Sequence, residues 1–206
     1  MVAAAVFVVI LTGCTDSGLM QSGSDGGDDG AGQVPTVSAE QLAARKQAAG
    51  IADCPDTDAA ASSFAGGLPD VELACLGGGQ PVRLAGLRGR PMMINVWAQW
   101  CGPCRQEAPY LAQVAAETKS SKMLIMGIDF DDPRPDLALE FAELSNWKYP
   151  QMQDADVTLR EELQISGPPQ TFFVTASGQI TYRHAAPFTS TKQIRDLAKD
   201  HLGVDL

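Results

Sequence analysis

Residues 92–111 read MMINVWAQWCGPCRQEAPYL, and this stretch decides the fold of the chain. The run from Met92 to Ala98 is apolar and rich in β-prone residues, whereas the apolar residues after Arg105 recur at helical spacing. The sequence therefore predicts a buried strand that passes directly into a helix over about 102–119, with two cysteines at the junction.

Cys101 and Cys104 are placed where the unpaired backbone N–H groups and the positive end of a helix macrodipole favour an anion. In Cys-x-x-Cys motifs this environment lowers the pKa of a thiol from about 8.5 to about 7 or below. We expect Cys101, at the helix end, to be the exposed nucleophile and Cys104, one turn deeper, to resolve the mixed disulfide. Pro103 shapes the first turn without losing an N–H, and Gly102 lets a partner's backbone approach. The pair predicts a dithiol switch that uses its own disulfide and no further cofactor.

Two other interpretations of the cysteine spacing are open. A structural zinc site needs four N or S ligands, usually from two such pairs, and the sequence has no second Cys-x-x-Cys and no His-x-x-x-His. An inert structural disulfide is the other alternative. The order strand, Trp-Cys, Pro-Cys, helix is more specific than the spacing alone and favours redox chemistry without a metal.

With these residues in view, the chain resembles the thioredoxin superfamily and, within it, the extracytoplasmic thiol-disulfide oxidoreductases of the TlpA and ResA kind. The resemblance depends on NVWAQWCGPCRQEAP at residues 95–109 and GPPQTF at residues 167–172, and it covers about residues 64–204. It implies an α/β, thioredoxin-like three-layer fold: a central mixed β-sheet flanked by helices, with an N-terminal β-hairpin and a TlpA-type helical insertion.

The hydrophobic pattern predicts further elements along the chain. The expected elements are a helix over 38–49, a hairpin formed by 68–75 and 82–84, strands over 91–97 and 123–130, a helix over 135–146, a strand at 149–152, a helix at 157–163, an antiparallel pair at 171–175 and 179–183, and a closing amphipathic helix through Ile194 and Leu202. The unbroken apolar run at 123–130 suits a parallel strand buried on both faces.

The second motif carries Pro168 and Pro169. The resemblance implies that Pro169 is cis, packs against the redox pair and follows a residue that pairs its backbone with a bound substrate. Cis bonds are nearly confined to X-Pro. Because Pro168 lacks an N–H, such pairing would use its carbonyl group alone, and a plain Pro-Pro turn is the alternative.

Glu107 lies three residues after Cys104, on the same side of the helix one turn further on. Ordinary thioredoxins carry a buried Asp at the position of Asn95, whereas ResA-like proteins carry a glutamate at the position of Glu107 that is implicated in proton transfer. The resemblance therefore implies that Glu107 accepts the proton of Cys104. The alternative is an acid that complements the helix dipole. Trp100 and Trp97 are expected to supply apolar surface beside the site.

The N-terminus predicts export. Residues 2–11 are wholly apolar, but about ten residues fall short of the roughly 20 that span a bilayer, which indicates a signal-peptide core. The following LTGC, ending at Cys14, resembles a bacterial lipobox, and this implies cleavage before Cys14 and a lipid on that residue. A plain secretory signal and a buried core segment are the alternatives.

The expected division of the chain follows its composition. It consists of a signal peptide over 1–13, the lipidated cysteine with a flexible linker rich in Gly, Ser and Asp over 14–37, a short helix and connector over 38–63, and a thioredoxin-like domain over 64–206. The hydrophobic fraction of 45% is ample for a core, and the net charge of -10 argues against nucleic-acid partners.

Of the five cysteines, Cys54 and Cys75 are left as an even remainder. We expect them to form a structural disulfide, which persists only in an oxidising compartment. The alternative is a second redox pair that passes electrons to Cys101 and Cys104. Together with the lipobox, this places the protein on the extracytoplasmic face of a bacterial membrane, anchored by lipid.

The resemblance implies a monomeric reductant outside the cytoplasm. Its electrons would come from a membrane thiol transporter of the CcdA or DsbD kind, and its substrates would be oxidised protein thiols such as those of apocytochrome c. Three rival functions differ in class: an oxidant that introduces disulfides, a binding module of thioredoxin-like form without turnover, and a peroxidase. The last lacks support because the sequence contains no Thr-x-x-Cys site.

Overall fold

The computed structural model describes residue 1 and residues 37–120 and 122–206. Residues 37–206 form one compact unit around a seven-stranded sheet of order β2-β1-β5-β4-β3-β6-β7. The helices and strands are α1 (Ala39–Ala49), β1 (Glu72–Cys75), β2 (Val82–Arg83), the 3-10 helix η1 (Leu84–Gly86), β3 (Met92–Trp97), α2 (Gly102–Glu117), β4 (Leu124–Phe130), α3 (Pro135–Leu144), β5 (Gln151–Asp154), α4 (Leu159–Glu162), β6 (Gln170–Val174), β7 (Ile180–His184) and α5 (Thr191–Leu202). The expected signal peptide and the lipidation site Cys14 lie outside the described residues, apart from Met1.

The centre of the sheet is mixed, as the resemblance implies. Strand β3 pairs in parallel with β4 and antiparallel with β6, and β4 pairs in parallel with β5. Every residue of β4 is buried, which confirms the strand predicted from the unbroken apolar run. The expected N-terminal hairpin is also present, because β1 pairs antiparallel with β2 and extends the sheet beyond β5.

Three predicted boundaries differ for backbone reasons. Helix α3 ends at Leu144 because Asn146 has a φ of 54°, which no helix continues. Helix α4 begins only at Leu159, after Val157 with a φ of 52°. Strand β5 begins at Gln151 rather than two residues earlier because Pro150 has no N–H to donate to the ladder.

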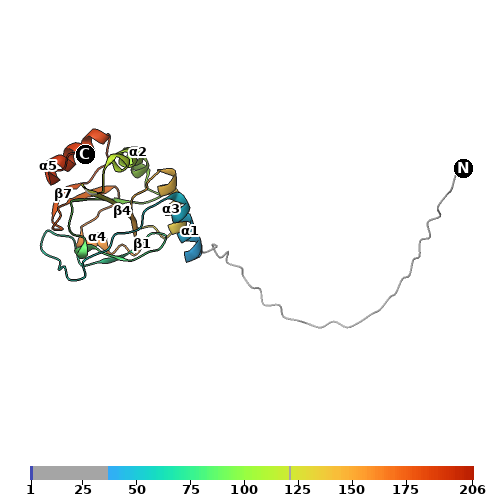
Figure 1. Cartoon of the computed structure of the whole chain (residues 1–206), viewed down its shortest axis with the longest axis horizontal. Helices are drawn as coiled ribbons and strands as arrows, with labels where there is room; N and C mark the ends of the chain where they lie inside the picture. Colours follow the sequence, from blue (N-terminus) through green and yellow to red (C-terminus); the bar gives the residue numbers. More distant parts are fainter. Residues whose placement is uncertain (2–36, 121) are drawn as a thin grey trace. The chain divides into compact units, whose positions relative to one another are not determined.

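Helices α2 and α5 pack together on one face of the sheet (Figure 1). Alternation along β3 sorts its side chains between two apolar clusters: Met93 and Trp97 join the cluster under α2, α3 and α5, whereas Met92, Ile94 and Val96 join the cluster on the other face with α4. Asn95 falls on the α2 side, and the strand thus presents an amide to the helix that carries the cysteines.

Helix α1 confirms the helix predicted before the domain. A capping box joins Ser38 and Gln41 at its start, and Gly50 ends it in the left-handed conformation with a φ of 67°. The helix packs against α3, and its Lys46 and Ala49 are buried. It therefore belongs to the compact unit.

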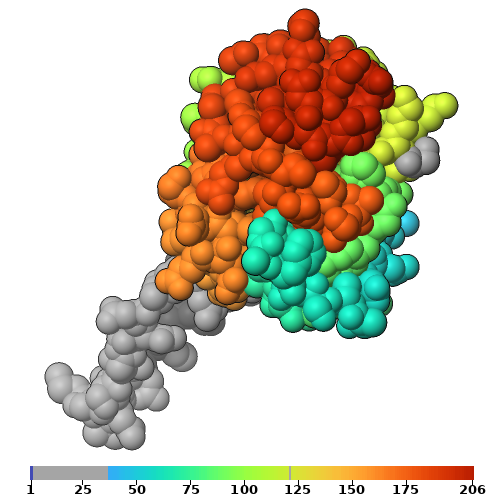
Figure 2. All heavy atoms as spheres, turned by 90° about the vertical axis from the view of Figure 1, so that its left-hand side faces the viewer, coloured from blue at the N-terminus to red at the C-terminus, as the bar shows by residue number. Residues whose placement is uncertain are grey.

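The connector between α1 and β1 also belongs to this unit. Figure 2 shows its later part, in teal, against the orange segment that contains β7. Backbone hydrogen bonds of 2.9 Å join Leu68 to Gly178 and Ile180 to Gly66, and they hold the two segments together. Within the described residues, no helix has both the length and the apolar character needed to cross a bilayer.

Candidate active site around Cys101 and Cys104

The structure places the two cysteines at the junction between β3 and α2 and joins them in a disulfide. Their sulfurs are 2.07 Å apart and their Cα atoms 5.3 Å apart. Cys101 is the N-cap of α2, and the backbone N–H of Cys104 donates a hydrogen bond of 3.1 Å to its sulfur. Pro103 lies in the first turn, where it removes no helical hydrogen bond. The helix terminus thus presents an N–H donor to the sulfur expected to react.

Cys101 is less accessible than the sequence predicts. Its relative exposure is 3% and that of Cys104 is 0%, so the expectation of an exposed Cys101 is wrong for the disulfide form. The reason is that Cys101 bonds back toward the helix interior and joins the apolar cluster under α2. Gly102 and Pro103, between the two cysteines, are exposed instead.

The two tryptophans have different roles. Trp100 is 47% exposed, and its indole N–H donates a hydrogen bond of 3.0 Å to the carbonyl of Asp131, which fixes an apolar surface beside Cys101. Trp97 is fully buried and lies against Phe141 and Trp147, with ring centroids 5.0 and 5.1 Å away. The expectation that Trp97 supplies surface is therefore wrong, because it occupies an inward position of β3.

Glu107 is fully buried beneath the helix surface. One carboxylate oxygen accepts a hydrogen bond of 2.9 Å from Nδ2 of Asn95, and the other accepts one of 2.9 Å from the backbone N–H of Phe188. Burial raises the pKa of Glu107 to about 7, although both hydrogen bonds act in the opposite direction. A carboxyl group with this pKa exchanges protons near neutral pH.

Pro168 and Pro169 precede β6, and the bond between them is cis. Because Gln170 pairs with Val96, Pro169 lies at the end of β3 from which the chain continues to Cys101. Pro169 is buried and Pro168 is half-buried. The side-chain amide of Gln170 donates a hydrogen bond of 3.0 Å to the carbonyl of Gly167 and closes the turn.

Asp129 and Asp132 were missed at the level of sequence. Asp132 accepts a hydrogen bond of 3.1 Å from the backbone N–H of Gln99, two residues before Cys101. Asp129 lies opposite Trp97 in the ladder, and burial, followed by the nearby charge of Asp132, raises its pKa to about 9. The sequence does contain one signal, because Asp129 is an acidic residue within the otherwise apolar stretch that forms β4.

The second disulfide joins Cys54 to Cys75, with sulfurs 2.03 Å apart and Cα atoms 5.9 Å apart. It ties the connector after α1 to strand β1. Strands β5 and β4 separate β1 from β3, a span of about 14 Å at about 4.8 Å per strand. This spacing gives no support to the alternative in which Cys54 and Cys75 pass electrons directly to the first pair within one chain.

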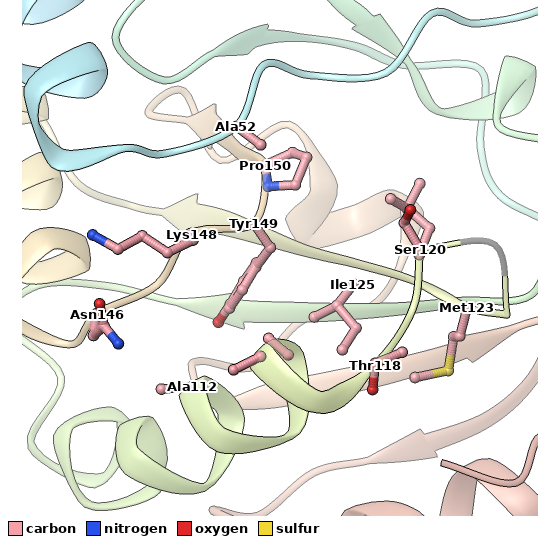
Figure 3. A pocket seen from close by; sticks show the side chains of 13 residues that line it. Ala52, Ala112, Thr118, Ser120, Met123, Ile125, Asn146, Lys148, Tyr149 and Pro150 are labelled. Carbon is pink, nitrogen blue, oxygen red and sulfur yellow. The ribbon is translucent and has the colours of Figure 1, made fainter.

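A cavity of about 250 Å³ lies along α2 and away from the cysteines (Figure 3). Ala112, Ile125, Tyr149 and Pro150 contribute to its lining, which includes neither a cysteine nor Glu107. Over residues 37–120 and 122–206, no three His, Cys, Asp or Glu side chains gather as metal ligands would. This cavity is therefore not part of the candidate site around the disulfide.

Comparison with protein families and curated proteins gives consistent matches. The family model described as AhpC/TSA family matches residues 66–183. The thiol:disulfide interchange protein DsbE of Escherichia coli (strain K12) is 36% identical over 98 residues, which are 48% of this chain and 51% of that protein. The protein of the same name from Pseudomonas fluorescens biotype C is 35% identical over 112 residues, 54% of this chain and 61% of that protein. The chain thus spans about half the length of the curated relatives it matches.

Solved structures show the same fold. A putative thiol:disulfide interchange protein DsbE from Chlorobium tepidum matches with a TM-score of 0.56 and 24% identity, over 65% of this chain and 94% of that one. A secreted Mycobacterium tuberculosis disulfide oxidoreductase matches with a TM-score of 0.53 and 24% identity, over 61% and 91%. These likenesses confirm the thioredoxin-like α/β fold that was expected from the sequence.

Proposed function

This chain belongs to the AhpC/TSA family, and from that membership we propose that it is an extracytoplasmic thiol-disulfide oxidoreductase that works as a reductant. The observation that carries the proposal is the disulfide between Cys101 and Cys104 at the N-terminus of α2, with Glu107 buried one turn further along the same helix. The relatives named as thiol:disulfide interchange proteins support this class of reaction.

The reaction consists of two exchanges. In the dithiol form, the Cys101 thiolate attacks a substrate disulfide, bonds to one sulfur and expels the other as a thiolate. Cys104 then attacks the sulfur of Cys101, breaks the mixed disulfide and releases the second substrate thiolate. The substrate gains two electrons, and the protein returns to the disulfide form that the structure describes.

The backbone at the start of α2 stabilises the attacking thiolate. The N–H of Cys104 donates to the Cys101 sulfur, and the helix macrodipole adds favourable charge at the same position. Because Cys101 is 3% exposed in the disulfide form, reduction of the protein by its donor begins at that small exposed fraction. Trp100 supplies the apolar surface on which a protein partner rests.

Glu107 takes the proton that Cys104 must lose before it attacks. A thiol is a poor nucleophile until it is deprotonated, and a general base works best when its pKa is near the operating pH. Glu107 meets this condition because burial raises its pKa to about 7. Asn95 and the backbone of Phe188 hold its two oxygens in place, so the carboxylate is fixed under the helix.

The partners follow from the same proposal. The substrates are oxidised protein thiols, including the Cys-x-x-Cys-His segments of apocytochrome c, and the electron donor is a membrane thiol transporter of the CcdA or DsbD kind. A lipid on Cys14 would hold the protein at the membrane. Support comes from the lipobox-like LTGC and from the relatives named as thiol:disulfide interchange proteins.

Turnover and redox state together test the proposal. We expect the purified protein to accelerate insulin reduction by dithiothreitol, Cys101→Ser to abolish the acceleration, and Cys104→Ser to accumulate the mixed disulfide. In cells, alkylation should trap Cys101 and Cys104 reduced when the membrane donor is present and oxidised when it is deleted. A pair that stays reduced without the donor, or a potential near -120 mV rather than near -270 mV, would contradict the reductant assignment.

A further inference from the structure

Lys46 places a buried ammonium against the second disulfide. The residue is 4% exposed, and its Nζ donates hydrogen bonds of 2.8 Å to Asp53, 2.8 Å to the carbonyl of Gly78 and 3.3 Å to the sulfur of Cys75. A buried charge requires compensation by paired or hydrogen-bonding groups. Asp53 supplies the opposite charge, but its side chain is 89% exposed, so water screens the pair.

This arrangement suits a reduced Cys75 better than an oxidised one. A sulfur in a disulfide is a weak, uncharged acceptor, whereas a thiolate carries a full negative charge. A thiol in contact with an ammonium is acidified, because the positive charge stabilises its thiolate. Lys46 therefore lies where it favours the product of reduction.

The two residues of this disulfide differ in exposure. Cys54 is half-buried, whereas Cys75 is 5% exposed. An attacking thiolate thus reaches Cys54 first, and the sulfur that must leave is the one beside Lys46. In thiol-disulfide exchange, a leaving thiol of lower pKa leaves faster. The greater exposure of Cys54 and the positive charge beside Cys75 therefore both favour attack at Cys54, with Cys75 as the leaving group.

Glycines in the turn after β1 permit this contact. Gly77 has a φ of 75°, and a Cβ there would come within 2.9 Å of the Lys46 side chain. A Cβ on Gly79 would lie 3.5 Å from Nζ of Lys46 and 3.6 Å from the Cys75 sulfur. An open cavity of about 780 Å³ runs between α1 and this turn and leaves room beside Lys46.

We propose that Cys54 and Cys75 form a second thiol-exchange site, at which a dithiol attacks Cys54 and Cys75 leaves as a thiolate paired with Lys46. The first step forms a bond between the reductant's sulfur and Cys54 and breaks the bond to Cys75, which keeps the electron pair. The reductant's second thiolate then attacks its own sulfur in the mixed disulfide and releases Cys54, which takes a proton from water. The reductant ends as a disulfide, and the connector after α1 is no longer covalently tied to β1.

This site is independent of the function proposed for Cys101 and Cys104. The charged group in contact with Lys46 is Asp53 on the connector, and Glu40 on α1 lines the same cavity. Among the described side chains, Asp53 is the one that forms an ion pair with Lys46. Lys148 instead donates to the carbonyl of Ala49 at the end of the same helix, which makes it a matched control.

The test uses the full chain with Cys14→Ser, Cys101→Ser and Cys104→Ser, so that the second pair titrates alone. After reduction with dithiothreitol, the rate of alkylation by iodoacetamide is followed against pH at each cysteine by peptide mass spectrometry. We expect the midpoint for Cys75 to lie below that for Cys54. Lys46→Met should raise the Cys75 midpoint by about one pH unit, about a tenfold loss of thiolate at pH 7. It should also slow reduction of the disulfide by dithiothreitol.

Two further variants separate charge from structure. Lys46→Arg keeps the positive charge and should keep the Cys75 midpoint low, whereas Lys148→Met loosens the same helix and should leave it unchanged. A Cys75 midpoint that does not respond to Lys46→Met would overturn the proposal. If that variant fails to fold, a Cys75 midpoint at or above that of Cys54 in the chain that retains Lys46 would overturn it as well.

Discussion

The two disulfides of this protein have buried titratable groups of different kinds in their surroundings. The pair Cys101 and Cys104 shares its helix with Glu107, a buried carboxyl group whose pKa is raised to about 7, whereas Cys75 contacts the ammonium of Lys46. An acid with a pKa near neutrality can take a proton from a thiol that must attack. An ammonium favours a thiolate that must leave. The surroundings of the two disulfides thus favour two different steps of thiol-disulfide exchange.

The disulfides also differ in the length of chain that they close and in accessibility. The first joins residues three apart and the second residues 21 apart. The residues of the first are at most 3% exposed, whereas Cys54 in the second is half-buried. A short loop constrains the unfolded chain less than a long one. The second disulfide therefore contributes more to the stability of the fold than the first, and its reduction removes that contribution.

The largest effect should come from removing the attacking sulfur. Cys101→Ser should reduce insulin-reduction activity to the uncatalysed background, because Cys104, the thiol that remains at the start of α2, is fully buried and does not reach a substrate disulfide. Replacing Cys54 and Cys75 together by Ser should leave this activity within about twofold, since strands β5 and β4 separate β1, which carries Cys75, from β3. If Cys101→Ser retained activity, or if the Cys54 and Cys75 variant lost it, the assignment of insulin reduction to the first disulfide would be wrong.

The free energy of unfolding should depend more on the second disulfide than on the first. Removal of the disulfide between Cys54 and Cys75 should lower the free energy of unfolding by about 3 kcal/mol, against about 2 kcal/mol for the pair Cys101 and Cys104, because the second bond closes the longer loop. Urea denaturation of the two double-serine variants at one pH measures the difference. Equal losses would mean that chain entropy does not distinguish the two bonds.

Glu107→Gln should slow turnover by about 100-fold at pH 7, because an amide cannot accept the proton of Cys104. In the unmodified chain, resolution of the mixed disulfide should accelerate as pH rises through about 7, where Glu107 loses its proton, and the variant should lack this inflection. Stopped-flow fluorescence across pH 5.5–8.5 gives the profile. Glu117→Gln, at an exposed position of the same helix, is the control and should keep the inflection.

A further prediction concerns the pH dependence of stability. Burial raises the pKa of Asp129 from 3.8 to about 9, so between these values the folded protein holds a proton that the unfolded chain releases. Stability therefore falls as pH rises in this window, by up to about 1.4 kcal/mol per pH unit for one proton. Glu107 contributes in the same direction between 4.5 and about 7.

Asp129→Asn should flatten this dependence. The measurement is the free energy of unfolding in urea at several values between pH 5 and 8, with the exposed Asp156→Asn as control. An unchanged slope in Asp129→Asn would show that Asp129 is ionised in the folded protein. In that case Glu107, and not Asp129, would be the buried acid that distinguishes the surroundings of the first disulfide from those of the second.

Much of the candidate site could be predicted because its residues are close in sequence. Cys101, Cys104 and Glu107 lie within two turns of one helix, so their spacing fixes their order along it. Asp132 and Lys46 could not be found in this way. Their contacts, with the backbone of Gln99 and the sulfur of Cys75, join residues 33 and 29 positions apart, and no local pattern encodes them.

By itself, the sequence determined the order of the helices and strands, the mixed sheet expected from the resemblance, and the placement of a cysteine pair at a helix start. Periodicity and helix-end chemistry are local, so they survive in the sequence. Tertiary structure decided which groups are buried. Cys101 is buried although the sequence predicts that it is exposed, and Trp97 lies in the core while Trp100 faces solvent. Lys46 is buried against the second disulfide. Burial and long-range contact set the charge around each sulfur, and both arise only when distant strands and helices pack together.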